Sequence, residues 1–149
     1  MSYSLVRPSE LLTRRILVID DEQANILLLR SLLEREGYSD IHCLTDSSQA
    51  LAEFVRLEPD LVLLDLMMPA PDGFQLLEAF KRHARADAFL PVLVLTADTT
   101  LGARRRALSL GANDFVSKPF DLVEVGLRIG NLLETRILYE RLRALHGTS

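Results

Sequence analysis

Five polar side chains of types that take part in metal and phosphate chemistry follow short apolar runs typical of strands. Asp20 and Asp21 follow the first run, Asp65 the third, Thr96 the fourth and Lys118 the fifth. Because ligands of an open parallel sheet bind outside the carboxyl ends of its strands, we expect these side chains to converge on one edge. The sequence therefore predicts a site made of three carboxylates, a hydroxyl and an ammonium group.

This combination of groups suits phosphoryl transfer assisted by a metal ion. Three carboxylates packed together repel one another, and a hard cation relieves that repulsion. Mg²⁺ prefers oxygen ligands, so a cluster of aspartates without histidine or cysteine suits it. The ammonium and hydroxyl groups would stabilise a transferring phosphoryl group, and a carboxylate can itself be the nucleophile that gives an aspartyl phosphate.

Each of these residues also has a purely structural interpretation. Asp20 and Asp21 are suitable N-cap residues for the helix that follows, Thr96 could simply end a strand, and Lys118 could lie on the surface. Asp65 is harder to explain by packing, because a charge directly after four apolar residues ends a buried strand. Their joint placement after four predicted strands favours a functional site.

The apolar runs and the segments between them predict an α/β fold. Predicted strands cover residues 16–19, 40–44, 61–64, 92–95 and 115–116, and predicted helices cover residues 24–36, 47–57, 73–85, 103–110 and 122–145. Three of the strands are apolar at every position, as strands buried on both faces require. Five consecutive βα units with right-handed crossovers give an open, doubly wound parallel sheet.

Composition limits the remaining classes of function. The chain has 149 residues, 48% hydrophobic and 26% charged, which is typical of one globular domain. Its net charge of −4 argues against nucleic acid or an anionic membrane as the main partner. Cys43 is the only cysteine and excludes an internal disulfide. With no apolar run of about 20 residues and no signal-peptide pattern, we expect a cytoplasmic protein.

Two extensions flank the predicted domain of residues 15–131. Residues 1–14 carry little pattern and are interpreted as an N-terminal arm, and residues 132–149 extend the last helix. Leu138, Leu142 and Leu145 form an apolar seam on this extension. The seam fits either an amphipathic end packed on its own domain or a coiled coil that forms a homodimer or leads to a fused output domain.

Residues 15–131 resemble the receiver domain of two-component response regulators, including the chemotaxis regulators. The matching segments are VIDDE at 18–22, LVLLDLMMPAPDG at 61–73, VLTA at 94–97 and FVSKPF at 115–120. The resemblance implies a flavodoxin-like, five-stranded parallel sheet in the order 2-1-3-4-5. It also implies a signalling module rather than an enzyme, whose only catalysis is its own phosphorylation and dephosphorylation.

The resemblance also implies a role for each site residue. Asp65 would accept the phosphoryl group from a sensor histidine kinase or a phosphotransfer protein. Asp20, Asp21 and Asp65 would hold Mg²⁺ together with the backbone carbonyl of Met67. Lys118 would bind a phosphoryl oxygen, and the bond between Lys118 and Pro119 is expected to be cis.

The resemblance also implies a conformational switch that follows phosphorylation. Thr96 would move toward the phosphoryl group, and Phe115, in a position where relatives often carry tyrosine, would turn inward behind it. Met67 and Asp98 would flank the phosphoryl group and control the approach of water.

Two alternatives remain at this stage. A pseudo-receiver would use the same fold to bind proteins without being phosphorylated. A phosphatase of the haloacid dehalogenase type also carries a nucleophilic aspartate after an apolar strand, but it needs a second aspartate two residues later, where this chain has Met67.

Overall fold

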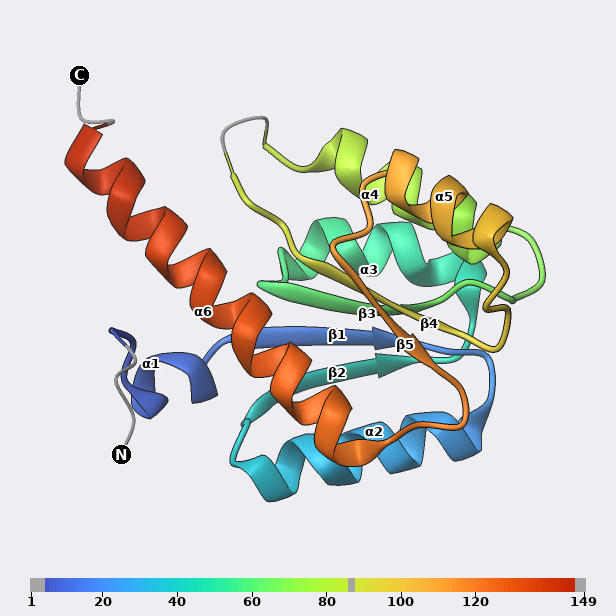
Figure 1. Cartoon of the computed structure of the whole chain (residues 1–149), viewed down its shortest axis with the longest axis horizontal. Coiled ribbons are helices and arrows are strands. Elements are labelled where there is room, and N and C mark those ends of the chain that lie inside the picture. Colours follow the sequence, from blue (N-terminus) through green and yellow to red (C-terminus); the bar gives the residue numbers. More distant parts are fainter. Residues whose placement is uncertain (1–4, 86–87, 147–149) are drawn as a thin grey trace.

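Five parallel strands form the centre of the structure, a computed structural model that describes residues 5–85 and 88–146. The strands are β1 (Arg15–Ile19), β2 (Asp40–Leu44), β3 (Leu61–Asp65), β4 (Val92–Thr96) and β5 (Asp114–Ser117). Their order in the sheet is β2-β1-β3-β4-β5, and all neighbours are parallel. The predicted flavodoxin-like order is therefore confirmed (Figure 1).

Helices cover both faces of this sheet. In chain order they are α1 (Pro8–Leu12), α2 (Gln23–Glu36), the 3-10 turn η1 (Ser47–Gln49), α3 (Ala50–Leu57), α4 (Gly73–His83), α5 (Leu101–Ser109) and α6 (Leu122–His146). Helices α3, α4 and α5 lie on one face, and α2 and α6 lie on the other (Figure 1). The doubly wound architecture predicted from the βα alternation is confirmed.

Two hydrophobic cores, one on each face, explain the apolar strands. Within β1, Leu17 and Ile19 contribute to the core under α3 and α4, whereas Ile16 and Val18 contribute to the core under α2 and α6. Every residue of β3 and of β4 is buried. A central strand that is covered on both sides has no solvent face, so polar residues are excluded until the strand ends.

The predicted elements are correct in type, with ends that differ from the structure by about two residues at most. The predicted helix of residues 47–57 is divided into two parts: it begins as the 3-10 turn η1 and continues as the α-helix α3. Asp46 starts this segment, since its carboxylate accepts the backbone N–H of Ser48 at 3.0 Å.

The predicted N-terminal arm contains a short helix that the sequence analysis did not predict. Helix α1 lies against α6, where the guanidinium of Arg141 forms an ion pair with Glu10 at 2.5 Å and donates to the carbonyl of Leu5 at 2.7 Å. Pro8 in the first turn and Glu10 close behind it are helix-start signals. Residues 1–4 of the arm and 147–149 of the C-terminal extension lie outside the described residues.

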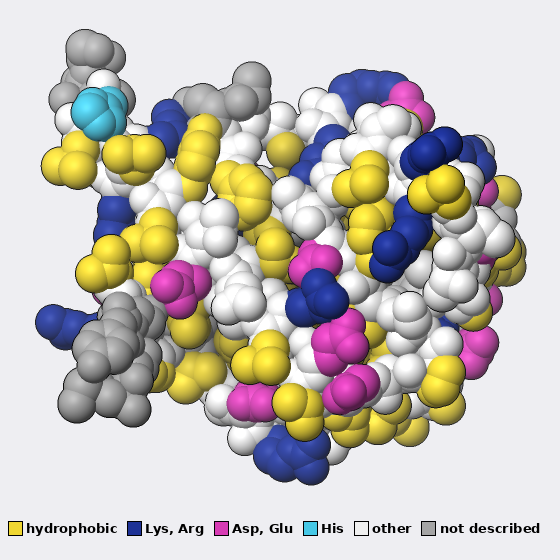
Figure 2. Space-filling view, in the orientation of Figure 1, with side chains coloured by type: hydrophobic (Ala, Val, Ile, Leu, Met, Phe, Trp, Pro, Cys, Tyr) yellow, Lys and Arg dark blue, Asp and Glu magenta, His cyan; other side chains and the backbone are white. Residues whose placement is uncertain are grey.

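Helix α6 is one continuous helix of 25 residues, and the predicted boundary at residue 131 falls inside it. Its buried side chains recur every four residues: Val125, Ile129, Leu133 and Ile137. The predicted seam lies on a different stripe, with Leu142 54% and Leu145 78% exposed. Figure 2 shows hydrophobic side chains gathered over this outer end of α6. Among the described helices, none is both long and apolar enough to cross a membrane.

Gly73 sets how closely α4 approaches the end of β3. A Cβ atom at this position would lie 2.2 Å from the carbonyl oxygen of Asp65 and 2.4 Å from the Cα of Leu66. Both atoms belong to the backbone, so no side-chain rotation can relieve the clash. We expect Gly73→Ala to lower the free energy of unfolding by about 3 kcal/mol, measured by denaturant unfolding.

Gly102 in α5 is the matched control. A Cβ atom there meets nothing within 4 Å, so Gly102→Ala should leave stability unchanged or raise it by up to about 1 kcal/mol. Equal losses in the two variants would contradict the steric explanation.

Candidate functional site

The carboxyl ends of β1, β3 and β5 bring two buried carboxylates and one ammonium group together. Lys118 Nζ lies 2.9 Å from Asp20 Oδ2 and 3.2 Å from Asp65 Oδ1. The side chain of Asp20 is fully buried and that of Asp65 is 2% exposed. One positive charge therefore bridges two negative charges at a place that is shielded from water.

Asp21 completes a cluster of three carboxylates. Asp20, Asp21 and Asp65 each offer an oxygen, and these oxygens all lie within 4.8 Å of one another. Unlike its neighbours, Asp21 is exposed, and no hydrogen bond to its carboxylate occurs among the described residues. The donor set of hard oxygen atoms is the kind that Mg²⁺ prefers, so the residues present fit this ion.

The surroundings of Asp20 fix its position and differ from the N-cap interpretation. The N-cap residue of α2 is Glu22, whose side chain makes no capping hydrogen bond. The carboxylate of Asp20 instead accepts the backbone N–H of Glu22 at 2.9 Å and the side-chain amide of Asn25 at 3.2 Å. Asn25 was not among the predicted site residues, although an amide about one turn into the helix after an aspartate is a recognisable partner.

Asp65 has one occupied and one available oxygen. Its Oδ1 accepts the backbone N–H of Met67 at 3.1 Å as well as the contact from Lys118, whereas Oδ2 has no donor within the described part of the chain. Burial and the charge of Asp20 together raise the pKa of Asp65 to about 7, in spite of the lowering effects of the Met67 N–H and of Lys118. The ionised form of this carboxyl group is therefore energetically disfavoured in the metal-free protein.

The pKa of Lys118 is raised as well, but for a lysine this shift favours the charged form. Burial alone would lower the pKa of Lys118, but its hydrogen bonds and charge interactions with Asp20 and Asp65 outweigh burial and raise it. The side chain is thus held as an ammonium ion. The peptide bond between Lys118 and Pro119 is cis, and so is the bond between Ala70 and Pro71, for which the sequence analysis made no prediction.

Thr96 lies at the end of β4, but its hydroxyl does not point at the carboxylates. The side chain is buried, its hydroxyl donates to the carbonyl of Asp98 at 3.2 Å, and it accepts the N–H of Asp98 at 2.9 Å. The carbonyl of Thr96 accepts the backbone N–H of Lys118 at 2.9 Å. Thr96 is therefore linked to the site through the backbone of Lys118.

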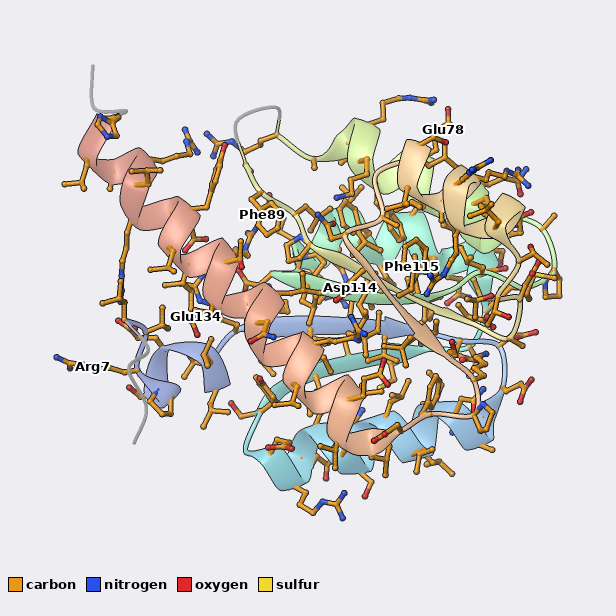
Figure 3. The ribbon with its side chains drawn as sticks, viewed as in Figure 1. Arg7, Glu78, Phe89, Asp114, Phe115 and Glu134 are labelled. Carbon is orange, nitrogen blue, oxygen red and sulfur yellow. The ribbon has the colours of Figure 1, made fainter. Side chains whose placement is uncertain are left out.

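Phe115 also faces away from the cluster of carboxylates. It is half-buried on β5, and the guanidinium of Arg104 lies 5.4 Å from the centre of its ring. Figure 3 labels Phe115 where β5 passes under α5. A cation above an aromatic face stabilises this outward position.

An open pocket of about 680 Å³ adjoins the site between α4 and α5. Met67, whose side chain is 58% exposed, and Asp98 both line it. The guanidinium of Arg106 lies 4.0 Å above the ring of Phe74 at the same pocket. Met67 and Asp98, which are predicted to flank the phosphoryl group, therefore line the same open pocket.

Comparison with known proteins identifies relatives of this chain. The family profile of the response regulator receiver domain matches residues 16–129. The transcriptional regulatory protein TrcR of Mycobacterium tuberculosis is 37% identical over 127 residues, which are 85% of this chain and 48% of that protein. The response regulator PleD of Caulobacter vibrioides is 37% identical over 132 residues, which are 89% of this chain and 29% of that protein.

Solved structures of response regulators have the same fold as this chain. A crystal structure of NtrX from Brucella abortus in complex with ATP aligns with a TM-score of 0.79 at 29% identity, over 92% of this chain and 30% of that chain. The chain therefore spans about half or less of the length of these relatives.

The raised pKa of Asp65 predicts how metal-free stability depends on pH. A carboxyl that binds its proton more tightly in the folded state adds stability below its unfolded pKa, and this stability is lost as the pH rises to about 7. We expect the protein in a chelator to be less stable at about pH 8 than at about pH 5 by a few kcal/mol from this residue. Asp65→Asn should remove that loss. A stability difference between variant and parent that is equal at both pH values, measured by denaturant unfolding, would refute this assignment.

Proposed function

This chain belongs to the response regulator receiver domain family, and we propose that it accepts a phosphoryl group on Asp65 from a histidine kinase or a phosphotransfer protein. The observation that carries the proposal is the position of Lys118 Nζ, in contact with the buried carboxylates of both Asp65 and Asp20. Packing alone gives no reason to bury this group of charges.

The available oxygen of Asp65 is suited to act as the nucleophile. Its Oδ2 would attack the phosphorus of a phosphohistidine, a P–O bond would form, and the P–N bond would break with its electron pair leaving on the imidazole. Lys118, already an ammonium ion at this place, would then pair with a phosphoryl oxygen. The hydroxyl of Thr96 would have to leave the carbonyl of Asp98 before it could donate to another phosphoryl oxygen.

The carboxylate cluster would hold Mg²⁺ during this transfer. Asp20, Asp21 and Asp65 would supply carboxylate oxygens and Met67 its backbone carbonyl. The bound ion would neutralise the carboxylates and the charge of the phosphoryl oxygens. Exposed Asp21 would be a direct ligand, and Asp20, whose two oxygens already accept hydrogen bonds, would act through water.

The switched surface would include Phe115 and α5. When the hydroxyl of Thr96 turns to the phosphoryl group, space behind it would allow Phe115 to turn inward and leave the guanidinium of Arg104. The surface formed by α5, β5 and the start of α6 would thereby change its shape and its charge.

The C-terminal extension would carry the signal to an output. Residues 132–149 would form a linker to a fused effector domain or a helix that pairs with a second copy, because Leu142 and Leu145 are exposed on it. The domain itself, residues 15–131, would act as a signalling module rather than an enzyme, in keeping with its family. We propose neither nucleic acid nor membrane as its direct partner.

Phosphorylation of Asp65 is tested with a small donor. The protein incubated with acetyl phosphate and Mg²⁺ should gain one phosphoryl group by intact mass, stable in acid and labile in base. Asp65→Asn should abolish the gain, and Asp98→Asn, a neighbouring carboxylate outside the cluster, should retain it. Absence of the gain, also with a panel of phosphorylated histidine proteins, would favour the pseudo-receiver, and steady release of phosphate without an adduct would favour a phosphatase.

Mg²⁺ binding is tested independently by calorimetry and thermal unfolding. At about 100 times its dissociation constant, Mg²⁺ should stabilise the protein by about 2.7 kcal/mol. Asp21→Asn should weaken binding by about tenfold or more because it removes an exposed charged ligand. Glu134→Gln on α6 changes the net charge equally and should have no effect, so equal losses in both variants would indicate general electrostatics instead of a site.

A further inference from the structure

Three donors contact the carboxylate of Asp20, whose side chain is fully buried. Its Oδ1 accepts the backbone N–H of Glu22 at 2.9 Å, and its Oδ2 contacts both Lys118 Nζ at 2.9 Å and the side-chain amide of Asn25 at 3.2 Å. The backbone N–H of Asp20 donates to the carbonyl of Leu44 at 3.1 Å, which fixes the main chain. The direction of the carboxylate therefore depends on these three donors.

Lys118 is not dedicated to Asp20. Its Nζ also lies 3.2 Å from Asp65 Oδ1, and in the proposed transfer it pairs with a phosphoryl oxygen carried by Asp65. As the ammonium group turns to that oxygen, Asp20 Oδ2 loses its closest donor. A buried carboxylate that loses a donor is destabilised, because water cannot take the place of the donor.

Asn25 is the donor that stays on Oδ2. It lies in the first turn of α2, where its backbone N–H donates to the carbonyl of Glu22 at 3.1 Å, so its position does not depend on β5. Its amide nitrogen lies 3.2 Å from Asp20 Oδ2 and 3.4 Å from Glu22 Oε2. Both neighbours are carboxylates, which accept hydrogen bonds and do not donate them when ionised. The NH₂ group of the amide must therefore face them.

Asn25 orients Asp20 without neutralising the cluster. The three carboxylates and the ammonium group of Lys118, all ionised, leave two net negative charges, which one divalent cation balances. A lysine or an arginine at position 25 would compete with that cation, and an aspartate would add to the repulsion. A neutral donor fixes the carboxylate and leaves its charge available.

We propose that Asn25 is a positioning residue of the phosphoacceptor site, which keeps the carboxylate of Asp20 in place when Lys118 turns to the phosphoryl group. The inference rests on the proposed function, because phosphorylation of Asp65 is what draws Lys118 away. Asn25 acts only through Asp20 and does not touch the reacting atoms. The first turn of α2 thereby becomes part of the support of the site.

Two donors on one oxygen should replace each other in part. While Lys118 contacts Oδ2, removal of Asn25 leaves that oxygen with the ammonium group. In a chain without Lys118, removal of Asn25 leaves the oxygen with neither donor, so the effect should be larger. A residue that only supports α2 would have the same effect in both chains.

A double-mutant cycle on the full chain tests this with Mg²⁺ alone. Calorimetry gives the dissociation constant of Mg²⁺ for the parent, Asn25→Leu, Lys118→Met and the double variant. Asn25→Leu should weaken Mg²⁺ binding by about threefold or less in the parent and by about tenfold or more in Lys118→Met. Asn131→Leu, at an exposed position of α6, is the matched control and should have no effect in either chain. Equal factors for Asn25→Leu in the two chains would overturn the proposal.

Hydrogen exchange gives a second measurement that does not need Lys118→Met to fold. The N–H of Glu22, which donates to Asp20 Oδ1, reports whether the carboxylate keeps its place. With Mg²⁺ and acetyl phosphate, this N–H should exchange about tenfold faster in Asn25→Leu than in the parent, and with Mg²⁺ alone by less than about threefold. Equal factors in both conditions, with the phosphoryl group present by intact mass, would contradict the role of Asn25. Absence of the phosphoryl group would count against the proposed function instead, and the Mg²⁺ cycle would then decide whether Asn25 replaces Lys118.

Discussion

The carboxylates of Asp20 and Asp65 are buried together with one ammonium group, that of Lys118, in contact with both. The charges do not balance, since two negative groups share one positive group and Asp21 adds a third carboxylate at the surface. Such a cluster is costly for a folded protein because desolvation and like-charge repulsion act in the same direction. Proteins keep such a loss of stability where function needs it. Binding a divalent cation and then a charged phosphoryl group is a function of this kind. The ionised carboxylate of Asp65 is thus disfavoured by its surroundings unless further positive charge is bound beside it.

The sheet is the element that makes this arrangement possible. Parallel strands end at one edge, so the last residue of β3 and the residues just after β1 and β5 meet although they are far apart in the sequence. Gly73 then lets α4 begin directly beside Asp65. The hydrogen bond from the Lys118 N–H to the Thr96 carbonyl connects the last two strands where the site begins.

Much of this could be predicted from the sequence, and the exceptions have physical reasons. Strands buried on both faces are apolar at every position, so residues such as Asp65 and Thr96 at their ends stand out. Helix α1 has only five residues and is too short to show a periodic pattern, and it depends on the contact of Arg141 with Glu10. The orientation of the Thr96 hydroxyl toward Asp98 depends on loop geometry.

Helix α6 begins four residues after Lys118 and continues without a break to His146. An α-helix of this kind is about 37 Å long at 1.5 Å per residue, and it is stiff along its axis. Val125, Ile129, Leu133 and Ile137 fix it on the sheet, while its last turns extend past the sheet. One unbroken rod of backbone hydrogen bonds therefore connects the loop that carries Lys118 with Leu142 and Leu145, which are exposed beyond the sheet. The buried carboxylates and this distant apolar surface thus belong to two ends of the same stiff element.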